Sequence, residues 1–331
     1  MAARLSFMST QPPIANTNQD LACLCKAAGD NLRLDILRAL ARDSYGVLEL
    51  AEAFAVKQSL MSHHLKTLTQ AGLVSSRREG NSIFYRRAPL EAQHPLSALK
   101  CSLFASLDKT WLSHEPQQRL KTIHQERAAT AQAFFIENAA KFRAQQDLIA
   151  SYSSYAAAVS QLLLNSDCAV QRALEVGPGE GEFLEVLSAR FERVLALDTS
   201  TAMLAQAEQF AAHKQLRNIN FRSGDTQLLW EFPAAFDCAV INMVLHHVPS
   251  PAQMILDVAA SLRPGGLLLI TDLCRHEQYW AKEACGDLWM GFDPDQLIDW
   301  AKAAELQLGQ STWLALRNGF QIQIHQFHKA R

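Results

Sequence analysis

The feature that most constrains the fold of this chain is a run of alternating glycines behind a short apolar segment, from Ala173 to Gly181. The run reads Ala-Leu-Glu-Val-Gly-Pro-Gly-Glu-Gly, and an amphipathic segment from Phe183 to Arg190 follows it. This order predicts a strand, a turn too tight for Cβ atoms, and a helix. In open α/β sheets, such a turn lies at the carboxyl end of a strand, where a ligand can approach bare backbone.

The residues around the turn argue against two common phosphate ligands. A dinucleotide fingerprint needs a small residue at position 182, where this chain has Glu182. A P-loop needs a lysine after the glycines, and none follows. A second apolar strand, Val194 to Leu197, instead ends in Asp198, placed where a ribose diol needs a bidentate acceptor. We therefore expect a nucleoside without a pyrophosphate.

Three later segments continue the pattern. Ser223-Gly224-Asp225 follows a third strand, and Phe236 to Asn242 forms a fourth. Leu262 to Gly266 makes a turn into a fifth strand, Leu267 to Thr271. In this order, the segments make residues 151–331 resemble a class I S-adenosylmethionine-dependent methyltransferase domain, with an α/β Rossmann-like fold.

The resemblance implies S-adenosylmethionine or S-adenosylhomocysteine as the ligand. In that family an acid opens the glycine motif, a second acid holds the ribose and a third contacts the adenine amino group. The residues implied to bind the nucleoside are Glu175, Gly177, Gly179, Gly181, Asp198, Thr199, Asp225, Thr226 and Asn242.

The end of the chain supports the same fold. A helix is expected over Pro294 to Leu306, followed by strands at Leu308–Leu316 and Phe320–Phe327. Arg317-Asn318-Gly319 separates the two strands, and Asn-Gly between alternating segments is a strong hairpin signal. The methyltransferase family appends such an antiparallel hairpin to its parallel sheet.

Residues 20–92 have a different pattern, that of a mostly helical winged helix-turn-helix domain. Leu32, Ile36, Leu37 and Leu40 lie on one face of a predicted helix. Further helices are expected at Val47–Phe54 and Gln58–Gln70, and Gly72 ends the second of them. Strands follow at Leu73–Arg77 and Ser82–Arg87, around a turn at Glu79-Gly80-Asn81.

The helix at Gln58–Gln70 carries donors suited to DNA. Its apolar side is formed by Met61, Leu65 and Leu68, and His64 is expected to be structural. The opposite stripe and the arginines of the wing would contact base edges and phosphates. The predicted DNA contacts are Gln58, Ser59, Ser62, His63, Lys66, Arg77, Arg78 and Arg86, with Arg87 beside them. The alternative is a solvated polar face on a protein-binding winged helix.

The same segment resembles the ArsR family of bacterial winged-helix repressors. The matching segments are Ala27 to Leu37, Leu50-Ala51, Met61 to Leu65 and Ala71 to Val74. Many members of that family sense metal through a Cys-x-Cys before the recognition helix, where this chain has Leu48-Glu49-Leu50. Cys23 and Cys25 point to different helix faces, and His94, His114 and His124 are irregularly spaced, so we expect no metal.

Residues 93–150 read as a helical connector. In the ArsR family a helix after the wing builds the dimer, and Leu96 to Trp111 could do so here, giving a homodimer. Phe134, Phe135 and Phe142 are expected to pack on the methyltransferase domain instead.

Composition limits the remaining possibilities. The net charge of −2 excludes a strongly basic protein but not a basic face. No apolar run approaches the roughly 20 residues of a membrane span, and seven scattered cysteines suit reduced thiols. A cytoplasmic protein without a membrane partner is expected. Residues 1–19, with Pro12-Pro13, are predicted to be a disordered tail.

Two functions remain open at this point. The architecture resembles fused ArsR-methyltransferase regulators of methionine metabolism, whose effector is S-adenosylhomocysteine. This favours a transcriptional regulator, most simply a repressor, that binds an operator in double-stranded DNA and responds to a nucleoside effector. The alternative is an active small-molecule methyltransferase with an autoregulatory winged helix. For that chemistry His246 and His247, just beyond the fourth strand, are candidate bases, or else they only cap the loop.

Overall fold

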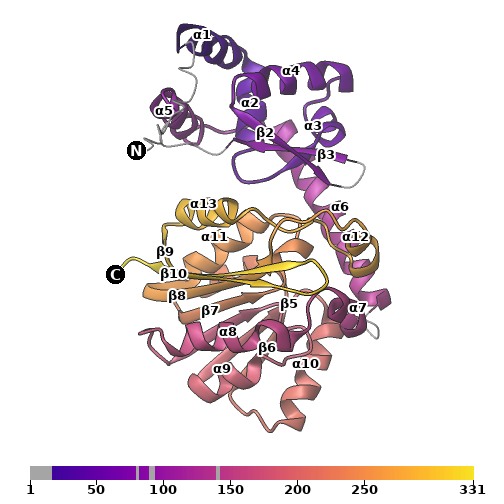
Figure 1. Cartoon of the computed structure of the whole chain (residues 1–331), viewed down its shortest axis with the longest axis vertical. Coiled ribbons are helices and arrows are strands. Elements are labelled where there is room, and N and C mark those ends of the chain that lie inside the picture. Colours follow the sequence, from indigo (N-terminus) through magenta and orange to yellow (C-terminus); the bar gives the residue numbers. More distant parts are fainter. Residues whose placement is uncertain (1–16, 80–81, 89–93, 139–141) are drawn as a thin grey trace, which may run out of the picture. The chain divides into compact units, whose positions relative to one another are not determined.

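The chain forms two compact units in the computed structural model (Figure 1). The structure describes residues 17–79, 82–88, 94–138 and 142–331. The first unit comprises residues 1–78 and 82–119, and the second comprises residues 79–81 and 120–331. Most of the predicted tail and two residues of the predicted wing turn, Gly80 and Asn81, lie outside the described residues.

The first unit is a winged helix built on a small apolar core. Its helices are α1 (Thr17–Ala28), α2 (Asn31–Ala39), α3 (Val47–Ala53), α4 (Gln58–Gln70) and α5 (Ser97–Leu107). Within the described residues, its sheet has the order β1-β3-β2, from β1 (Tyr45–Gly46), β2 (Val74–Glu79) and β3 (Ser82–Arg87). The fully buried side chains include Ile36, Leu37, Leu50, Met61, Leu65 and Leu68.

Local hydrogen bonds determine where these helices begin. Asp30 caps α2 by accepting from the backbone N–H of Arg33 at 3.0 Å. Glu49 reaches back to accept from the N–H of Gly46, at the start of α3, at 2.6 Å. The bounds predicted for α4 and β3 are confirmed. Helix α1 begins at Thr17, so residues 17–19 are helical and not part of a tail.

The second unit is a seven-stranded α/β sheet, counted over the described residues, with strand order β6-β5-β4-β7-β8-β10-β9. The strands are β4 (Arg172–Val176), β5 (Arg193–Asp198), β6 (Ile219–Ser223), β7 (Phe236–Asn242), β8 (Leu262–Leu273), β9 (Leu306–Ala315) and β10 (Gln321–Lys329). Strands β4 to β8 pair in parallel, whereas β10 is antiparallel to both β8 and β9. The terminal hairpin and the Rossmann-like fold are therefore confirmed.

Helices cover both faces of this sheet (Figure 1). One face carries α8 (Tyr152–Leu164), α9 (Leu184–Arg190) and α10 (Thr201–His213), and the other carries α11 (Pro251–Ser261) and α13 (Pro294–Ala303). Shorter elements are α7 (Phe142–Ile149), η2 (Thr226–Glu231), η3 (Leu245–His247) and α12 (Trp280–Cys285). Helix α6 (His114–Asn138) contains the boundary between the two units.

Two details of the second unit differ from the sequence prediction or refine it. Helix α13 ends at Ala303 because Glu305 takes a left-handed backbone conformation, with φ of +61°, and β9 begins at Leu306. The helix predicted to reach Leu306 is therefore too long. Phe134 of α6 packs against Gly286, as expected, while the side chains of Phe135 and Phe142 lie outside the described residues.

A buried carboxylate fastens the amino ends of the strands. Asp237, at the start of β7, accepts from the backbone N–H groups of Gln171 and Arg172 at 2.9 and 2.8 Å. Its other oxygen pairs with Nη1 of Arg263 at 2.8 Å. These bonds fix β4 and β7 in register and leave the opposite, carboxyl edge of the sheet for the site. Among the described residues, no helix is long and apolar enough to cross a membrane.

Candidate functional sites

The glycine turn between β4 and α9 has no room for side chains on its protein side. Gly177, Gly179 and Gly181 have φ of +68°, +57° and +88°, the left-handed region that favours glycine. A Cβ on Gly177 would lie 2.4 Å from Cγ2 of Val244, whereas a Cβ on Gly179 would meet no atom within 4 Å. Packing therefore requires Gly177, while Gly179 borders open space that a ligand could use.

Beside this turn lies a group of buried polar atoms that lack hydrogen bonds. Glu175 of β4 and Asn242 of β7 are both buried, and Thr271 is the register partner of Asn242 on β8. In the described part of the chain, Oε2 of Glu175, both amide atoms of Asn242 and Oγ1 of Thr271 have no hydrogen-bond partner. Unsatisfied buried polar atoms are rare in proteins, so this group is a candidate for contact with a ligand.

The environment changes the charge of Glu175. Burial raises the pKa of its carboxyl to about 8, and the neighbouring Asn242 amide offsets only part of this. Glu175 is therefore mostly neutral at pH 7. Tyr152 and Tyr155 of α8 face it: burial and then the charge of Glu175 raise the pKa of Tyr152 to about 12, and that of Tyr155 is raised for the same reasons.

The two tyrosines were missed in the sequence. Tyr155 is buried, and the hydroxyl of Tyr152 donates to the backbone oxygen of Glu182 at 3.4 Å. Tyrosines three residues apart lie on one face of a helix, and this pair precedes the strand of the glycine motif. The three-residue spacing was the sequence signal from which this pair could have been predicted.

The other predicted nucleoside contacts lie at the ends of β5 and β6. Asp198 ends β5 and accepts from the N–H of Ser200 at 2.8 Å, and burial raises its pKa to about 6, so it is ionised at pH 7. Thr199 and Asp225 are exposed. The hydroxyl of Thr226 donates to the buried Asp257 at 2.7 Å. The proton of this hydroxyl is therefore not available to a ligand.

The loop after β7 holds His246 and His247 in η3, and both are buried. Nδ1 of His246 lies 2.8 Å from Asp272. Burial alone would lower the pKa of His246, but Asp272 and Asp287 raise it to about 9. Burial and the neighbouring His246 lower the pKa of His247 well below its usual value. This separation of the two pKa values favours the alternative in which the pair holds the loop.

In the first unit, α4 presents the predicted stripe to solvent. Gln58, Ser59, Ser62, His63 and Lys66 are all exposed, whereas Met61, Leu65 and Leu68 are buried. His64 is buried with Nδ1 3.5 Å from Nη1 of Arg33, so its expected structural position is confirmed. The exposed side of α4 thus offers donors spaced along one helix face.

The wing arginines divide into two groups. Arg78 is exposed, and Arg77 and Arg86 are partly exposed on β2 and β3. Arg87 turns inward: its Nε donates to the backbone oxygen of Leu37 at 2.7 Å, and its Nη2 pairs with Asp108 at 2.8 Å. Its guanidinium also stacks on Phe104. The expectation that Arg87 grips DNA is therefore wrong, because the side chain fastens the wing to α2 and α5.

Family models match both units. Residues 30–76 match the bacterial regulatory protein arsR family, and residues 174–270 match a methyltransferase domain. The first match covers α2 to the start of β2, and the second runs from the glycine turn into β8. The chain therefore combines an ArsR-family helix-turn-helix with a methyltransferase domain.

Individual relatives match less than half of the chain. The ubiquinone biosynthesis O-methyltransferase of Coxiella burnetii is 28% identical over 168 residues, covering 46% of this chain and 71% of the relative. The enzyme of the same name from Xanthomonas campestris is 27% identical over 151 residues, covering 41% and 63%.

Solved structures resemble the chain at lower identity. One is a 1,6-didemethyltoxoflavin-N1-methyltransferase from Burkholderia thailandensis with bound S-adenosylhomocysteine (19% identity, TM-score 0.48, 63% of this chain and 91% of that one). Another is an N-methyltransferase from Bradyrhizobium japonicum in complex with S-adenosylhomocysteine (20%, TM-score 0.42, 53% and 87%).

The packing of the glycine turn predicts unequal costs for two alanine substitutions. We expect Gly179→Ala to lower the free energy of unfolding by about 1 kcal/mol, the cost of a left-handed alanine. Gly177→Ala should cost at least about 1 kcal/mol more, because its methyl group must also displace Val244. Urea unfolding followed by far-UV circular dichroism measures both. Val244→Ala should recover the extra cost in the double variant, and equal costs for the two glycines would contradict this account.

Proposed function

We propose that this protein is a DNA-binding transcriptional regulator whose methyltransferase-like domain binds S-adenosylhomocysteine or S-adenosylmethionine as an effector. The observation that carries the proposal is the unpaired polar group of Glu175 and Asn242 beside the open side of Gly179. It supports a nucleoside site in the second unit of a chain that also carries the exposed stripe of α4. A nucleoside there would use Asp198 for its ribose and Asp225 for its adenine.

The charge of the pocket supports a preference for S-adenosylhomocysteine. S-adenosylmethionine carries a positive sulfonium and the demethylated product does not. A neutral Glu175 offers the sulfonium no opposite charge, and burying an unpaired cation is costly. The uncharged product therefore fits the pocket better near pH 7.

The proposed regulation needs only a modest coupling free energy between effector binding and DNA binding. A hundredfold change in DNA affinity corresponds to about 2.7 kcal/mol, which lies within the usual range for allosteric coupling. A homodimer, with α5 as the candidate dimer helix, would place two recognition helices about one turn of DNA apart. Leu99 of α5 and Trp111 beyond it are exposed large apolar residues, which suits such a contact.

The second candidate function is methyl transfer to a small molecule. The relatives named ubiquinone biosynthesis O-methyltransferase favour it, and the glycine turn and Asp198 are as suited to a donor as to an effector. Methyl transfer needs little beyond alignment of donor and acceptor, a deprotonated acceptor and exclusion of water. His246 or His247 would be the base on this alternative.

The deciding experiment is a titration of the full chain on its own upstream DNA, with each nucleoside added separately. We expect S-adenosylhomocysteine to shift the DNA affinity at least tenfold. Asp198→Ala should remove this shift and leave DNA binding without effector unchanged, whereas the exposed control Asp295→Ala should keep it. If neither nucleoside shifts the affinity, the regulator proposal fails and a screen of methyl acceptors follows.

The DNA face makes a separate prediction. Lys66→Ala and Arg78→Ala should each weaken DNA binding and reduce the slope of log affinity against log salt by about one, because each removes a phosphate contact. Fluorescence anisotropy over a series of salt concentrations measures both quantities. Lys302→Ala, exposed on α13, is the matched control. Parent affinity in both variants at every salt concentration would refute the DNA assignment.

The raised pKa of Glu175 predicts a pH-dependent choice of ligand. As pH rises from 7 to 9, the carboxyl ionises through about 8 and becomes a partner for the sulfonium. The ratio of S-adenosylmethionine to S-adenosylhomocysteine affinity should rise by at least about fivefold, or roughly 1 kcal/mol. Calorimetry measures the two affinities. In their ratio, the pH-dependent contributions of groups that both ligands share largely cancel. Glu175→Gln should flatten the ratio, and an equal pH dependence in that variant would instead implicate another group that titrates in this range, such as His246 with its pKa of about 9.

A further inference from the structure

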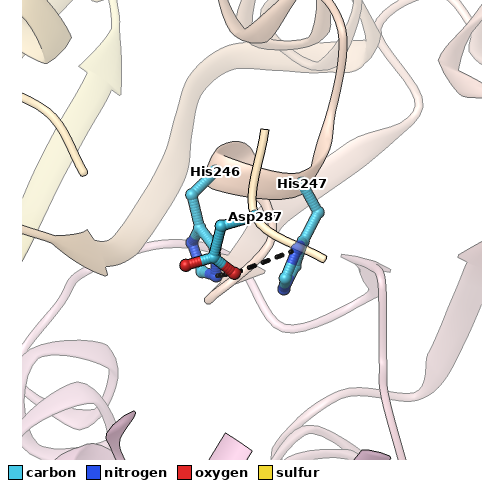
Figure 2. A group of neighbouring side chains, drawn as sticks. All are labelled: His246, His247 and Asp287. Carbon is cyan, nitrogen blue, oxygen red and sulfur yellow. Dashed lines mark ion pairs between the residues drawn. The ribbon is translucent and has the colours of Figure 1, made fainter. Parts of the chain in front are cut away.

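Three side chains with metal-binding atoms converge in the second unit (Figure 2). His246 and His247 come from η3, and Asp287 comes from the segment after α12. Oδ1 of Asp287 lies 3.9 Å from Nε2 of His246 and 3.6 Å from Nδ1 of His247. The three ligand atoms all lie within 4.8 Å of one another, and all three residues are buried.

Three polar atoms of the cluster, on His246 and Asp287, lack hydrogen bonds in the described part of the chain. Within the described residues, Nε2 of His246 and both carboxylate oxygens of Asp287 have no hydrogen-bond partner. The separations of 3.6 and 3.9 Å are too long for hydrogen bonds. A buried carboxylate without hydrogen bonds is costly, so this cluster calls for a further partner.

Surrounding groups orient both imidazole rings. Nδ1 of His246 lies 2.8 Å from Oδ1 of Asp272, which also accepts from the N–H of Leu273 at 2.7 Å. This contact directs Nε2 toward Asp287, and because the raised pKa of about 9 keeps His246 protonated near pH 7, an ion would have to displace the proton from Nε2. Nε2 of His247 lies 3.1 Å from the Gln146 side-chain amide, while Nδ1 lies 3.4 Å from the backbone oxygen of Gly286 and 3.6 Å from Oδ1 of Asp287, so an ion would have to replace the contact with Gly286. A carboxylate behind a histidine is the usual support of a metal ligand.

The spacing suits a small tetrahedral ion. Bonds of about 2.0–2.1 Å at tetrahedral angles place neighbouring ligand atoms about 3.4 Å apart. The two separations from Asp287, 3.6 and 3.9 Å, need to close by a few tenths of an ångström, and the two imidazole nitrogens lie within 4.8 Å of each other. Two imidazoles and one carboxylate are ligands that zinc prefers, and three protein ligands leave a fourth position open.

We propose that His246, His247 and Asp287 form a binding site for one divalent transition-metal ion of the zinc type. The ion would occupy the space between the three ligand atoms, with water or another oxygen ligand in the fourth position. This site departs from our sequence expectation of no metal, and it does not depend on the effector assignment. The competing explanation is an imidazolium of His246 shared between Asp272 and Asp287, with no ion.

The test is metal titration of the chelator-treated full chain, with Zn²⁺ in calorimetry and Co²⁺ in visible absorption. We expect one ion per chain and a tetrahedral cobalt spectrum. Asp287→Asn and His247→Gln should each lower the metal affinity at least tenfold, and Asp272→Asn should lower it about ten- to hundredfold. His328→Gln, a partly buried histidine of β10, is the matched control and should bind as the parent does.

The free cysteines require a second control, because Cys23 and Cys25 are at least partly exposed. Cobalt bound to thiolates would show strong near-ultraviolet charge-transfer absorption, and the Cys23→Ser/Cys25→Ser double variant would then lose the ion. That outcome overturns the proposal, as does unchanged binding in both Asp287→Asn and His247→Gln. The absence of binding by the parent chain would leave the shared imidazolium as the explanation. Far-UV circular dichroism of each metal-free variant checks that a loss of binding is not a loss of fold.

Discussion

The site edge of the second unit depends on one buried carboxylate, Asp272. It ends the parallel part of β8, and its oxygens accept from the backbone N–H groups of Leu245 and Leu273 while one of them also meets His246. Three contacts satisfy a charge that would otherwise be costly inside the protein. They also fix the loop after β7, and Val244 of that loop supports Gly177. A single side chain thus connects the glycine turn with the histidine pair.

Local sequence signals were sufficient for most of the fold. The apolar strand before the glycines, the Asn318-Gly319 turn and the helix at Gln58–Gln70 each show a period or turn chemistry that belongs to one structure. Where the signal was absent, the prediction failed. Neither Ala304 nor Glu305 is a residue type that indicates a left-handed backbone conformation, so the predicted helix ran too far, to Leu306. The two-residue strand β1 is too short to show any alternation.

The site was predictable where its residues are close in sequence and less so where the fold brings them together. The glycines and Asp198 follow single strands, so their edge of the sheet could be expected. Tyr155, on a separate helix, is close enough to Glu175 for that carboxyl to raise its pKa, and Asp287 lies 3.9 Å from His246, 41 residues away in the sequence. Arg87 shows the opposite error. A basic residue on a wing predicts DNA contact from composition, yet Leu37 and Asp108 hold it inside the unit.

The charge of Glu175 separates the two candidate functions on physical grounds. An enzyme that turns over must bind the cationic donor and release the neutral product, which an ionised carboxylate near the sulfonium favours. A sensor of the product needs the reverse preference, which a neutral carboxyl supplies. The fold can serve either purpose, because the glycine turn and Asp198 are proposed to hold the parts that donor and product share. Within the described residues, burial raises the pKa of Glu175 and only the Asn242 amide opposes this rise, which favours the proposed sensor over the enzyme.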